Sequence, residues 1–241
     1  MKKTALITGA SGGIGSAAAL KLAEDGYDLY LHGNTGKEKL KELKEACSMA
    51  GNDVLTIEAD LSGKEGNEKL LASINRPIDL LLLNSGMSYY GLMTDIEEED
   101  MEKMIYLGVT SPYKLARQLV PGMIQRKSGC ILVITSIWGI TGASCEVLYS
   151  MVKGGQNTFV KALAKELAPS GIRVNGIAPG AVKTNMLNDF TEEELEALEN
   201  EIPAGRLAEP EEIAESVRFL ASNKASYING QILSVNGGWH C

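Results

Sequence analysis

The stretch Thr8-Gly9-Ala10-Ser11-Gly12-Gly13-Ile14-Gly15 decides the fold, because it joins a short apolar run to a segment with helical spacing. Residues 4–8 (TALIT) are typical of a buried strand, and residues 16–26 carry alanine and leucine on one helix face. Glycines at such a junction allow a tight turn, let the backbone approach a phosphate and bring the helix close to the sheet. The stretch therefore predicts a nucleotide-binding turn at the first strand–helix crossing of an α/β fold.

The rest of the chain alternates between predicted strands and helices, with short connections and no linker or internal repeat. Further strands are expected at residues 29–32, 54–58, 78–83, 130–135, 173–178 and 231–235. Further helices are expected at residues 37–50, 68–74, 98–123, 148–167, 192–199 and 211–221. The runs IDLLLL and CILVIT are apolar without alternation, as in parallel sheets that helices cover on both faces. We predict a single domain over residues 1–241, with a doubly wound parallel sheet of the Rossmann type.

The composition excludes several classes of protein. Lys and Arg number 23 against 31 Asp and Glu, and the resulting net charge of −8 argues against a nucleic-acid binder. The longest apolar run, residues 130–134, is far shorter than the roughly 20 residues of a membrane-spanning helix. Four cysteines without a C-x-x-C pair, and only two histidines, predict reduced thiols in a cytoplasmic protein without disulfides or a metal site.

Two acidic runs, residues 97–100 and 192–194, raise the alternative of a metal site. Each falls at a predicted helix start, where carboxylates complement the helix dipole. Thr191 and Glu194 also have the spacing of a capping box, in which each side chain bonds the backbone of the other residue. We interpret both runs as helix caps and predict no metal site.

Several short motifs follow one another in an order that resembles the short-chain dehydrogenase/reductase family. They are Thr8-Gly9-x-x-x-Gly13-x-Gly15, Asp60-Leu61, Asn84-Ser85-Gly86, Ser136, Tyr149-x-x-x-Lys153, residues 172–175 and Pro179-Gly180. The resemblance covers nearly the whole chain and implies an NAD(P)-dependent oxidoreductase. The cofactor site that it implies consists of Gly9, Ser11, Gly12, Gly13, Ile14, Gly15, Asn34, Thr35, Asp60, Leu61, Asn84, Gly86, Tyr149, Lys153, Pro179, Gly180 and Thr184.

The end of the second predicted strand indicates which cofactor is used. Enzymes that use NAD place an acidic residue there to bind the ribose 2′-hydroxyl, and this charge would repel the 2′-phosphate of NADP. Here the strand ends in His32-Gly33-Asn34-Thr35, without a carboxylate, so NADPH is favoured. Gly12 stands where many NADP-using relatives carry a basic residue, which leaves Asn34, Thr35 or Lys37 to bind the phosphate.

Ser136, Tyr149 and Lys153 are the candidate catalytic residues. Tyr149 and Lys153 are four residues apart and so share a helix face. A free tyrosine has a pKa of about 10, which we expect a neighbouring ammonium and the positive charge of oxidised nicotinamide to lower. Tyr149 can then give a proton to a carbonyl oxygen. Ser136 follows a buried strand and is expected to orient the same oxygen, while Lys153 also holds the nicotinamide ribose.

One position of the family pattern differs in this chain. Typical members carry an asparagine in the long helix before the catalytic serine, and it helps to relay protons through water. Gly108 stands at that position, so the relay role does not carry over. Glycine offers only backbone groups and space, in which we expect a water molecule, and a Gly108→Asn substitution is expected to be tolerated.

Two substrates, each attached to a different carrier protein, are candidates. Residues 149–155, 172–180 and 234–238 resemble 3-oxoacyl-[acyl-carrier-protein] reductases, which dock an acidic carrier on two basic positions flanking the cleft. Lys127 matches one of these, but the other is Ser170. Residues 136–146 and 238–241 resemble a narrower Bacillus-type group named for reducing a 5-aminopentanone on elongation factor P. In that interpretation Glu146 meets the substrate amine; otherwise it is a surface acid at a helix start.

A third hypothesis is a nucleotide sensor without catalysis, which is less favoured because Tyr149 and Lys153 are both present. The family resemblance also implies a homotetramer, for which Gly154, Gly155 and Ala162 would allow close helix packing. The segment 185–205 is expected to cover the substrate cleft.

Overall fold

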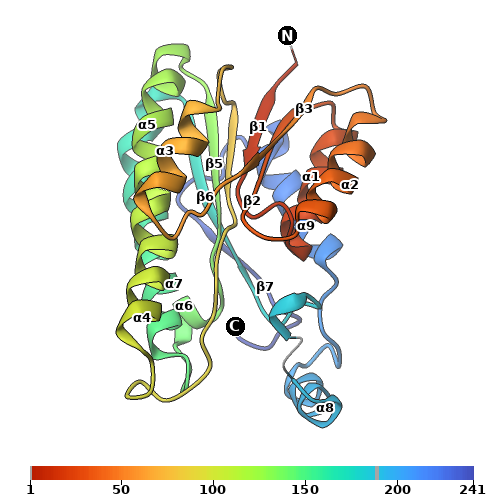
Figure 1. The fold of residues 1–241 in the computed structure, drawn as a ribbon, viewed down its shortest axis with the longest axis vertical. Helices are drawn as coiled ribbons and strands as arrows, with labels where there is room; N and C mark the ends of the chain where they lie inside the picture. Colours follow the sequence, from red (N-terminus) through yellow and green to blue (C-terminus); the bar gives the residue numbers. More distant parts are fainter. Residues whose placement is uncertain (1, 188–189) are drawn as a thin grey trace.

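The computed structural model describes residues 2–187 and 190–241 and contains a seven-stranded parallel sheet in the order β3-β2-β1-β4-β5-β6-β7 (Figure 1). The strands are β1 (Thr4–Ile7), β2 (Asp28–Gly33), β3 (Val54–Glu58), β4 (Leu80–Leu83), β5 (Gly129–Ile134), β6 (Ile172–Pro179) and β7 (Ile232–Val235). Every neighbouring pair is parallel, so all carboxyl ends meet at one edge of the sheet. The predicted doubly wound parallel sheet is confirmed.

Helices cover both faces of this sheet. The α-helices are α1 (Gly13–Glu24), α2 (Lys37–Ser48), α3 (Lys64–Ala72), α4 (Glu98–Ile105), α5 (Ser111–Arg126), α6 (Trp138–Thr141), α7 (Val147–Leu167), α8 (Glu192–Glu201) and α9 (Pro210–Ala221). A π-helix, η1 (Tyr106–Thr110), joins α4 to α5, and short 3-10 helices are η2 (Ala168–Ser170), η3 (Asn185–Leu187) and η4 (Asn223–Ala225). None of the helices in the described ranges is long and apolar enough to cross a bilayer.

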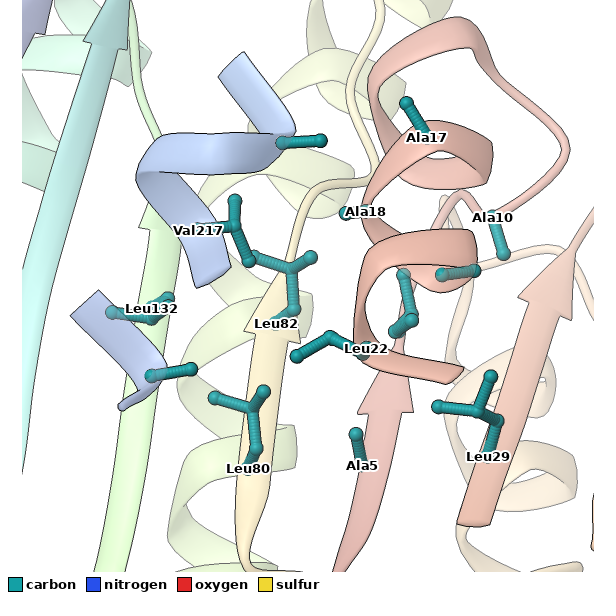
Figure 2. Close-up of a cluster of buried hydrophobic side chains, with 14 of the residues drawn as sticks. Ala5, Ala10, Ala17, Ala18, Leu22, Leu29, Leu80, Leu82, Leu132 and Val217 are labelled. Atoms are coloured by element: carbon teal, nitrogen blue, oxygen red, sulfur yellow. The ribbon is translucent and has the colours of Figure 1, made fainter. Parts of the chain in front are cut away.

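The sheet separates two hydrophobic cores. Along β4, Leu80 and Leu82 belong to the core shared with α1 and α9, whereas Leu81 and Leu83 belong to the core shared with α5 and α7. Figure 2 shows Leu80 and Leu82 directed toward α1, where Leu22 lies. Because successive strand residues point to opposite faces, a strand between two helix layers is apolar at every position.

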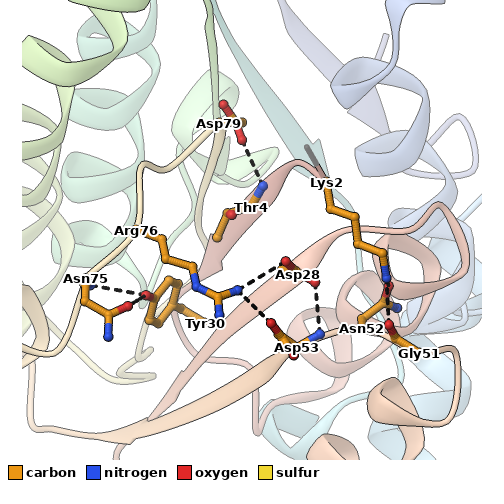
Figure 3. A network of polar contacts seen from close by, with 10 residues as sticks. All are labelled: Lys2, Thr4, Asp28, Tyr30, Gly51, Asn52, Asp53, Asn75, Arg76 and Asp79. Carbon is orange, nitrogen blue, oxygen red and sulfur yellow. Dashed lines mark hydrogen bonds and ion pairs between the residues drawn. The ribbon is translucent and has the colours of Figure 1, made fainter.

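A polar network ties the strand starts together at the amino edge of the sheet (Figure 3). Arg76 Nη1 lies 2.9 Å from a carboxylate oxygen of Asp53 and 3.3 Å from one of Asp28. The backbone N–H of Thr4 donates to Asp79 Oδ2 over 2.9 Å. Exposed ion pairs contribute at most about 1 kcal/mol each, so this network aligns the strands more than it stabilises them.

Both acidic runs lie at the starts of helices. Glu98, Glu99 and Asp100 lie in the first turn of α4. Thr191 and Glu194 form the predicted capping box at the start of α8. No group of three or more potential metal ligands of the types His, Cys, Asp and Glu lies within residues 2–187 and 190–241.

The long helix predicted for residues 98–123 is not regular. It is divided into α4, η1 and α5, and the π-helical turn is centred on Gly108. The short helix α6 was not predicted, and α1 begins at Gly13 instead of residue 16. Single π-turns of this kind arise within α-helices and often lie at functional sites.

Candidate active site

The glycine-rich turn lies at the carboxyl end of β1, next to the point where the strand order reverses between β1 and β4. Gly9 has a φ of +67°, which glycine adopts without strain. A Cβ at Gly15 would collide with the carbonyl oxygen of Gly9, and a Cβ at Gly13 would lie 2.8 Å from Thr184 Cγ2. The glycines therefore permit the turn and bring both α1 and the predicted binding residue Thr184 close to it.

Asn84, directly after β4, fastens this turn. Its Nδ2 donates to the carbonyl oxygens of Thr8 and Gly9, each over 3.0 Å. Thr8 Oγ1 in turn accepts hydrogen bonds from the backbone N–H groups of Asn84 and Ser85. The loops that follow the two central strands are thus held together at the strand-order reversal.

The start of α1 is suited to a phosphate. Gly12 precedes the helix, and among the described residues no side chain caps the N–H groups of its first turn, which Gly13, Ile14 and Gly15 supply. Such N–H groups and the positive end of the helix dipole bind anions. Ser11 Oγ lies 3.0 Å from the position that a Cβ on Gly33 would take, so the turn also reaches the end of β2. These residues fit the pyrophosphate of a dinucleotide.

The predicted adenosine-binding residues lie after β2 and β3. Asn34 and Thr35 are exposed, and Leu61 is buried. Asp60 Oδ1 accepts hydrogen bonds from Ser62 Oγ and Ser62 N over 2.7 and 2.9 Å. These bonds hold the pKa of the Asp60 carboxyl below its usual value. All four predicted residues follow the carboxyl ends of the neighbouring strands β2 and β3.

The lysine considered for the 2′-phosphate has a partner within the chain. Lys37 Nζ forms an ion pair with Glu58 Oε2 at 2.5 Å. Glu58 is the last residue of β3 and pairs in register with Gly33. A phosphate bound by Lys37 would therefore have to compete with Glu58, whereas Asn34 and Thr35 have no such charged partner among the ion pairs of the described residues.

Ser136, Tyr149 and Lys153 meet at the carboxyl end of β5. Ser136 is buried two residues beyond the strand, and its Oγ accepts a hydrogen bond from Trp138 N over 3.1 Å. Lys153 Nζ lies 5.5 Å from the centroid of the Tyr149 ring and donates to the carbonyl oxygen of Ile134 over 2.9 Å. Since an ammonium has three donors, this bond leaves Lys153 able to bind another acceptor.

The loop after β4 and the end of β6 border the place where Ser136, Tyr149 and Lys153 meet. A Cβ on Gly86 would lie 3.7 Å from Lys153 Nζ. Pro179 O accepts a hydrogen bond from Ile137 N over 3.1 Å, and Gly180 N donates to Val235 O over 3.0 Å. Ser85 Oγ is buried and has no hydrogen-bond partner within the described residues. The edge thus offers polar groups to a ligand that lies between β4, β5 and β6.

Burial governs the ionisation of the catalytic pair. It raises the pKa of Tyr149 to about 12, against a smaller lowering by the hydrogen bond from Ser136. It lowers the pKa of Lys153 to about 8. The lowered pKa expected for Tyr149 from the ammonium and oxidised nicotinamide is not seen in the protein without cofactor, where the loss of hydration on burial is the largest effect. Tyr149 is consequently a neutral phenol near pH 7, in the form that donates a proton.

Comparison with known proteins identifies the family. A family model described as enoyl-(acyl carrier protein) reductase matches residues 9–240. The 3-oxoacyl-[acyl-carrier-protein] reductase FabG of Rickettsia prowazekii is 40% identical over 237 residues, which are 98% of this chain and 96% of the relative. The chain belongs to the short-chain dehydrogenase/reductase family. A relative from Bacillus subtilis named uncharacterized oxidoreductase YmfI is 60% identical over 242 residues, with 100% of both chains covered.

Solved structures of short-chain dehydrogenases/reductases share the fold. The angucycline C-6 ketoreductase LanV with bound NADP has a TM-score of 0.93 and 28% identity, covering 98% of this chain and 95% of that chain. The L-sorbose reductase of Gluconobacter frateurii, complexed with NADPH and L-sorbose, has a TM-score of 0.91 and 31% identity, covering 99% and 96%. The predicted oxidoreductase class is thereby confirmed.

Lys127 and Ser170 occupy the two positions that resemble carrier-docking sites, but within one chain they do not flank the cleft. Lys127 follows α5 two residues before β5 begins, and Ser170 ends η2 two residues before β6 begins. Both lie at the amino edge of the sheet, opposite Ser136. A Cβ on Gly171 would lie 2.6 Å from Lys127 O, so the two positions are neighbours. The expectation placed them at the cleft because position in the sequence does not show which edge a loop occupies.

The direction in which a side chain at Gly108 would point is already filled. A Cβ on Gly108 would collide with Cγ1 of Val152, which is buried directly before Lys153. The carbonyl oxygen of Gly108 accepts a hydrogen bond from Gln156 Nε2 over 2.7 Å. The predicted water-filled space above Gly108 is therefore wrong, since two side chains of α7 fill it in this short-chain dehydrogenase/reductase.

Two tryptophans that were not part of the predicted site lie beside Glu146, the residue considered for a substrate amine. The rings of Trp138 and Trp239 form an edge-to-face pair with centroids 5.0 Å apart. Glu146 forms a hydrogen bond with the Trp138 side chain, and burial raises the pKa of its carboxyl. The charge of Glu146 also raises the pKa of Tyr149, which shows that the two side chains are near neighbours. The available signal was the pair of tryptophans, the only two in the sequence.

Proposed function

We propose that the protein reduces a ketone to an alcohol with NADPH. The observation that carries this proposal is the meeting of Ser136, Tyr149 and Lys153 at the carboxyl end of β5, beside Gly86. When bound, NADPH supplies the hydride for the carbonyl carbon. Tyr149 donates its phenolic proton to the carbonyl oxygen, which becomes the alcohol, and Lys153 stabilises the remaining phenolate. The Ser136 hydroxyl donates a hydrogen bond to the same oxygen and orients it.

The surroundings of Asn34 and Thr35 support NADPH over NADH. Neither residue carries a charge that would repel a 2′-phosphate, and both are exposed directly after β2. Lys37 is close enough to Glu58 for an ion pair, and a bound phosphate would compete for it. Lys153 binds the nicotinamide ribose in this proposal, with the donors that its bond to Ile134 leaves free.

A Thr35→Asp variant is expected to change the cofactor preference. The new carboxylate would repel the 2′-phosphate and bind a ribose hydroxyl, so the ratio of kcat/KM for NADPH to that for NADH should fall by about tenfold or more. Thr35→Asn serves as the control, because asparagine has the shape of aspartate without its charge, and it should keep the wild-type ratio. Steady-state kinetics with both cofactors measure it. An unchanged ratio in Thr35→Asp would contradict the assignment of the 2′-phosphate site.

The substrate proposed first is a 3-oxoacyl thioester. The support is the identity of 40% with a named 3-oxoacyl-[acyl-carrier-protein] reductase over 98% of this chain. The exposed apolar side chains around the cleft, such as Leu92 and Met93, agree with an acyl chain. The ring of Tyr90 lies 6.3 Å from that of Phe190, so the loop after β4 meets the segment 185–205. We propose that this segment covers the cleft; its residues 188 and 189 lie outside the described residues.

A second candidate substrate is a ketone that carries an ammonium group, such as the 5-aminopentanone on elongation factor P. The specific observation in its favour is Glu146, whose carboxylate lies by Tyr149 and the Trp138–Trp239 pair. A carboxylate beside aromatic rings binds an ammonium by charge and cation–π attraction. An uncharged acyl chain would make neither of these interactions with the carboxylate and the rings.

A screen of NADPH consumption distinguishes these candidates. The purified protein is offered 3-oxoacyl thioesters, uncharged ketones and a protein-bound aminoketone. If the ammonium is recognised, Glu146→Gln should lower kcat/KM for the aminoketone by about tenfold or more and leave uncharged ketones within about twofold. Turnover of thioesters alone, unaffected by Glu146→Gln, would support the first candidate. NADPH binding without turnover of any carbonyl compound would support the nucleotide sensor and contradict the proposed reductase.

We also propose a homotetramer that associates through α5 and α7. Gly155 and Ala162 are exposed on α7, and a Cβ on Gly155 would meet no atom within 4 Å. The apolar side chains of Val109, Tyr113 and Met151 are exposed on the same helical layer. Such a face supports the close packing of helices from two copies. All four cysteines are free thiols, in agreement with the cytoplasmic location that we propose.

A further inference from the structure

We propose that His32 positions the two loops that bind the cofactor, and that tight NADPH binding requires its imidazole to be neutral. His32 lies near the end of β2 and is 2% exposed. The inference rests on the proposed use of NADPH and adds a residue outside the predicted cofactor site. It also gives the binding of NADPH a dependence on pH.

Both ring nitrogens of His32 have partners on different loops. Nδ1 accepts a hydrogen bond from Gly9 N over 3.2 Å, and Nε2 lies 2.9 Å from the carbonyl oxygen of Ala59. Because the amide of Gly9 is a donor, Nδ1 must carry the lone pair and Nε2 the proton. The backbone oxygen of His32 also accepts from Ala10 N over 2.7 Å. One residue of β2 therefore bonds the glycine-rich turn and the loop after β3.

These contacts act on the residues that would bind the dinucleotide. The peptide groups of Gly9 are held on both sides, the N–H by His32 and the carbonyl oxygen by Asn84. Gly9 has a φ of +67°, and this conformation aims the turn toward the start of α1. Ala59 directly precedes Asp60 and Leu61. The imidazole thus sets the distance between the phosphate-binding and the adenosine-binding parts of the site.

Protonation would break this arrangement. A second proton on Nδ1 would oppose the N–H of Gly9, so two donors would face each other and the bond would be lost. The turn from Gly9 to Gly15 contains no titratable side chain, and Asp60 is the acidic group that acts on His32 from the loop after β3. Burial lowers the pKa of His32, against smaller raising effects of the Ala59 bond and of Asp60. The imidazole is therefore neutral near pH 7 and gains its proton only in acid.

The test is a fluorescence titration of the intact protein with NADPH between about pH 5 and pH 8. The wild type should bind less tightly toward the acid end. His32→Leu, which offers no acceptor to Gly9, should raise the Kd at pH 8 by about tenfold or more, with kcat at saturating NADPH within about twofold. His32→Asn places an amide oxygen near the position of Nδ1 and should recover most of the affinity, with a weaker dependence on pH that reflects the 2′-phosphate of NADPH alone. His240→Asn, at the other histidine of the chain, should keep the wild-type dependence.

Each outcome decides between the possibilities. Wild-type binding that is flat over this range, or an acid dependence that is as steep in His32→Asn as in the wild type, would overturn the inference even if His32→Leu does not fold. A His32→Leu protein that binds NADPH like the wild type would also overturn it. Absence of NADPH binding by the wild type at pH 8 would instead overturn the proposed function and this inference together. The KM for NADPH, rather than kcat, should carry the effect, because Ser136 follows β5 and Tyr149 and Lys153 lie on α7, away from His32 on β2.

Discussion

Replacing Tyr149 by phenylalanine is expected to lower kcat for NADPH-dependent reduction by about 10³-fold, while the Kd for NADPH changes by less than about threefold. The phenol is the group that gives a proton to the carbonyl oxygen, and phenylalanine keeps its ring but not its proton. Lys153 should keep its bond to the carbonyl oxygen of Ile134 in the variant. Its ammonium therefore stays beside Gly86 in the loop after β4. Stopped-flow measurement of NADPH oxidation and a fluorescence titration separate the two quantities.

The control for this substitution is Tyr227→Phe, at an exposed tyrosine that should show wild-type kinetics. The pH profile adds an independent readout. The pKa of Lys153 lies near 8, below the ordinary value for lysine, whereas that of Tyr149 lies near 12. The reduction needs the ammonium and the neutral phenol, so kcat of the wild type should hold below pH 8 and fall as Lys153 loses its proton above it. Retention of more than about a tenth of the wild-type kcat in Tyr149→Phe would contradict the role of Tyr149.

The strands and the turn between them could be predicted because their signals are local. A strand between two helix layers must be apolar throughout, and Leu80–Leu83 and Cys130–Ile134 have this composition. The glycines at 9, 13 and 15 are each needed for a close approach that any Cβ would prevent or strain. The pair Tyr149 and Lys153 lies on one helix, so its spacing is set by helix geometry alone.

Features that depend on contacts between distant segments could not be predicted in this way. The pairing of Lys37 with Glu58 requires the register of β2 on β3. The bonds of His32 to Gly9 and Ala59 join three segments of the chain. The pKa of Tyr149 depends on its burial, which the sequence around residue 149 does not show. Sequence spacing therefore predicts which residues take part, but it does not show what surrounds them.

At Gly108, the local sequence signal and the contacts in the structure lead to opposite expectations for stability. A glycine in a helix is ordinarily a poor choice by about 0.5–1 kcal/mol relative to alanine, so the sequence suggests that a larger residue would improve the helix. The structure instead directs Val152 Cγ1 into the place of the missing side chain. Valine has one strongly preferred rotamer in a helix, so it cannot turn away without cost.

We therefore expect Gly108→Asn to lower the free energy of unfolding by about 1–3 kcal/mol, as overpacking does in a filled core. The kcat should fall with it, because Val152 directly precedes Lys153 on α7 and any shift of that turn moves the ammonium. Val152→Ala is the matched control: by itself it should cost about 1–3 kcal/mol, since it removes buried methyl groups. Combined with Gly108→Asn it should cost clearly less than the sum of the two, because the alanine leaves room for the asparagine. Urea unfolding of the four proteins measures this coupling, and a Gly108→Asn protein as stable and active as the wild type would show that the space beside Val152 is open after all.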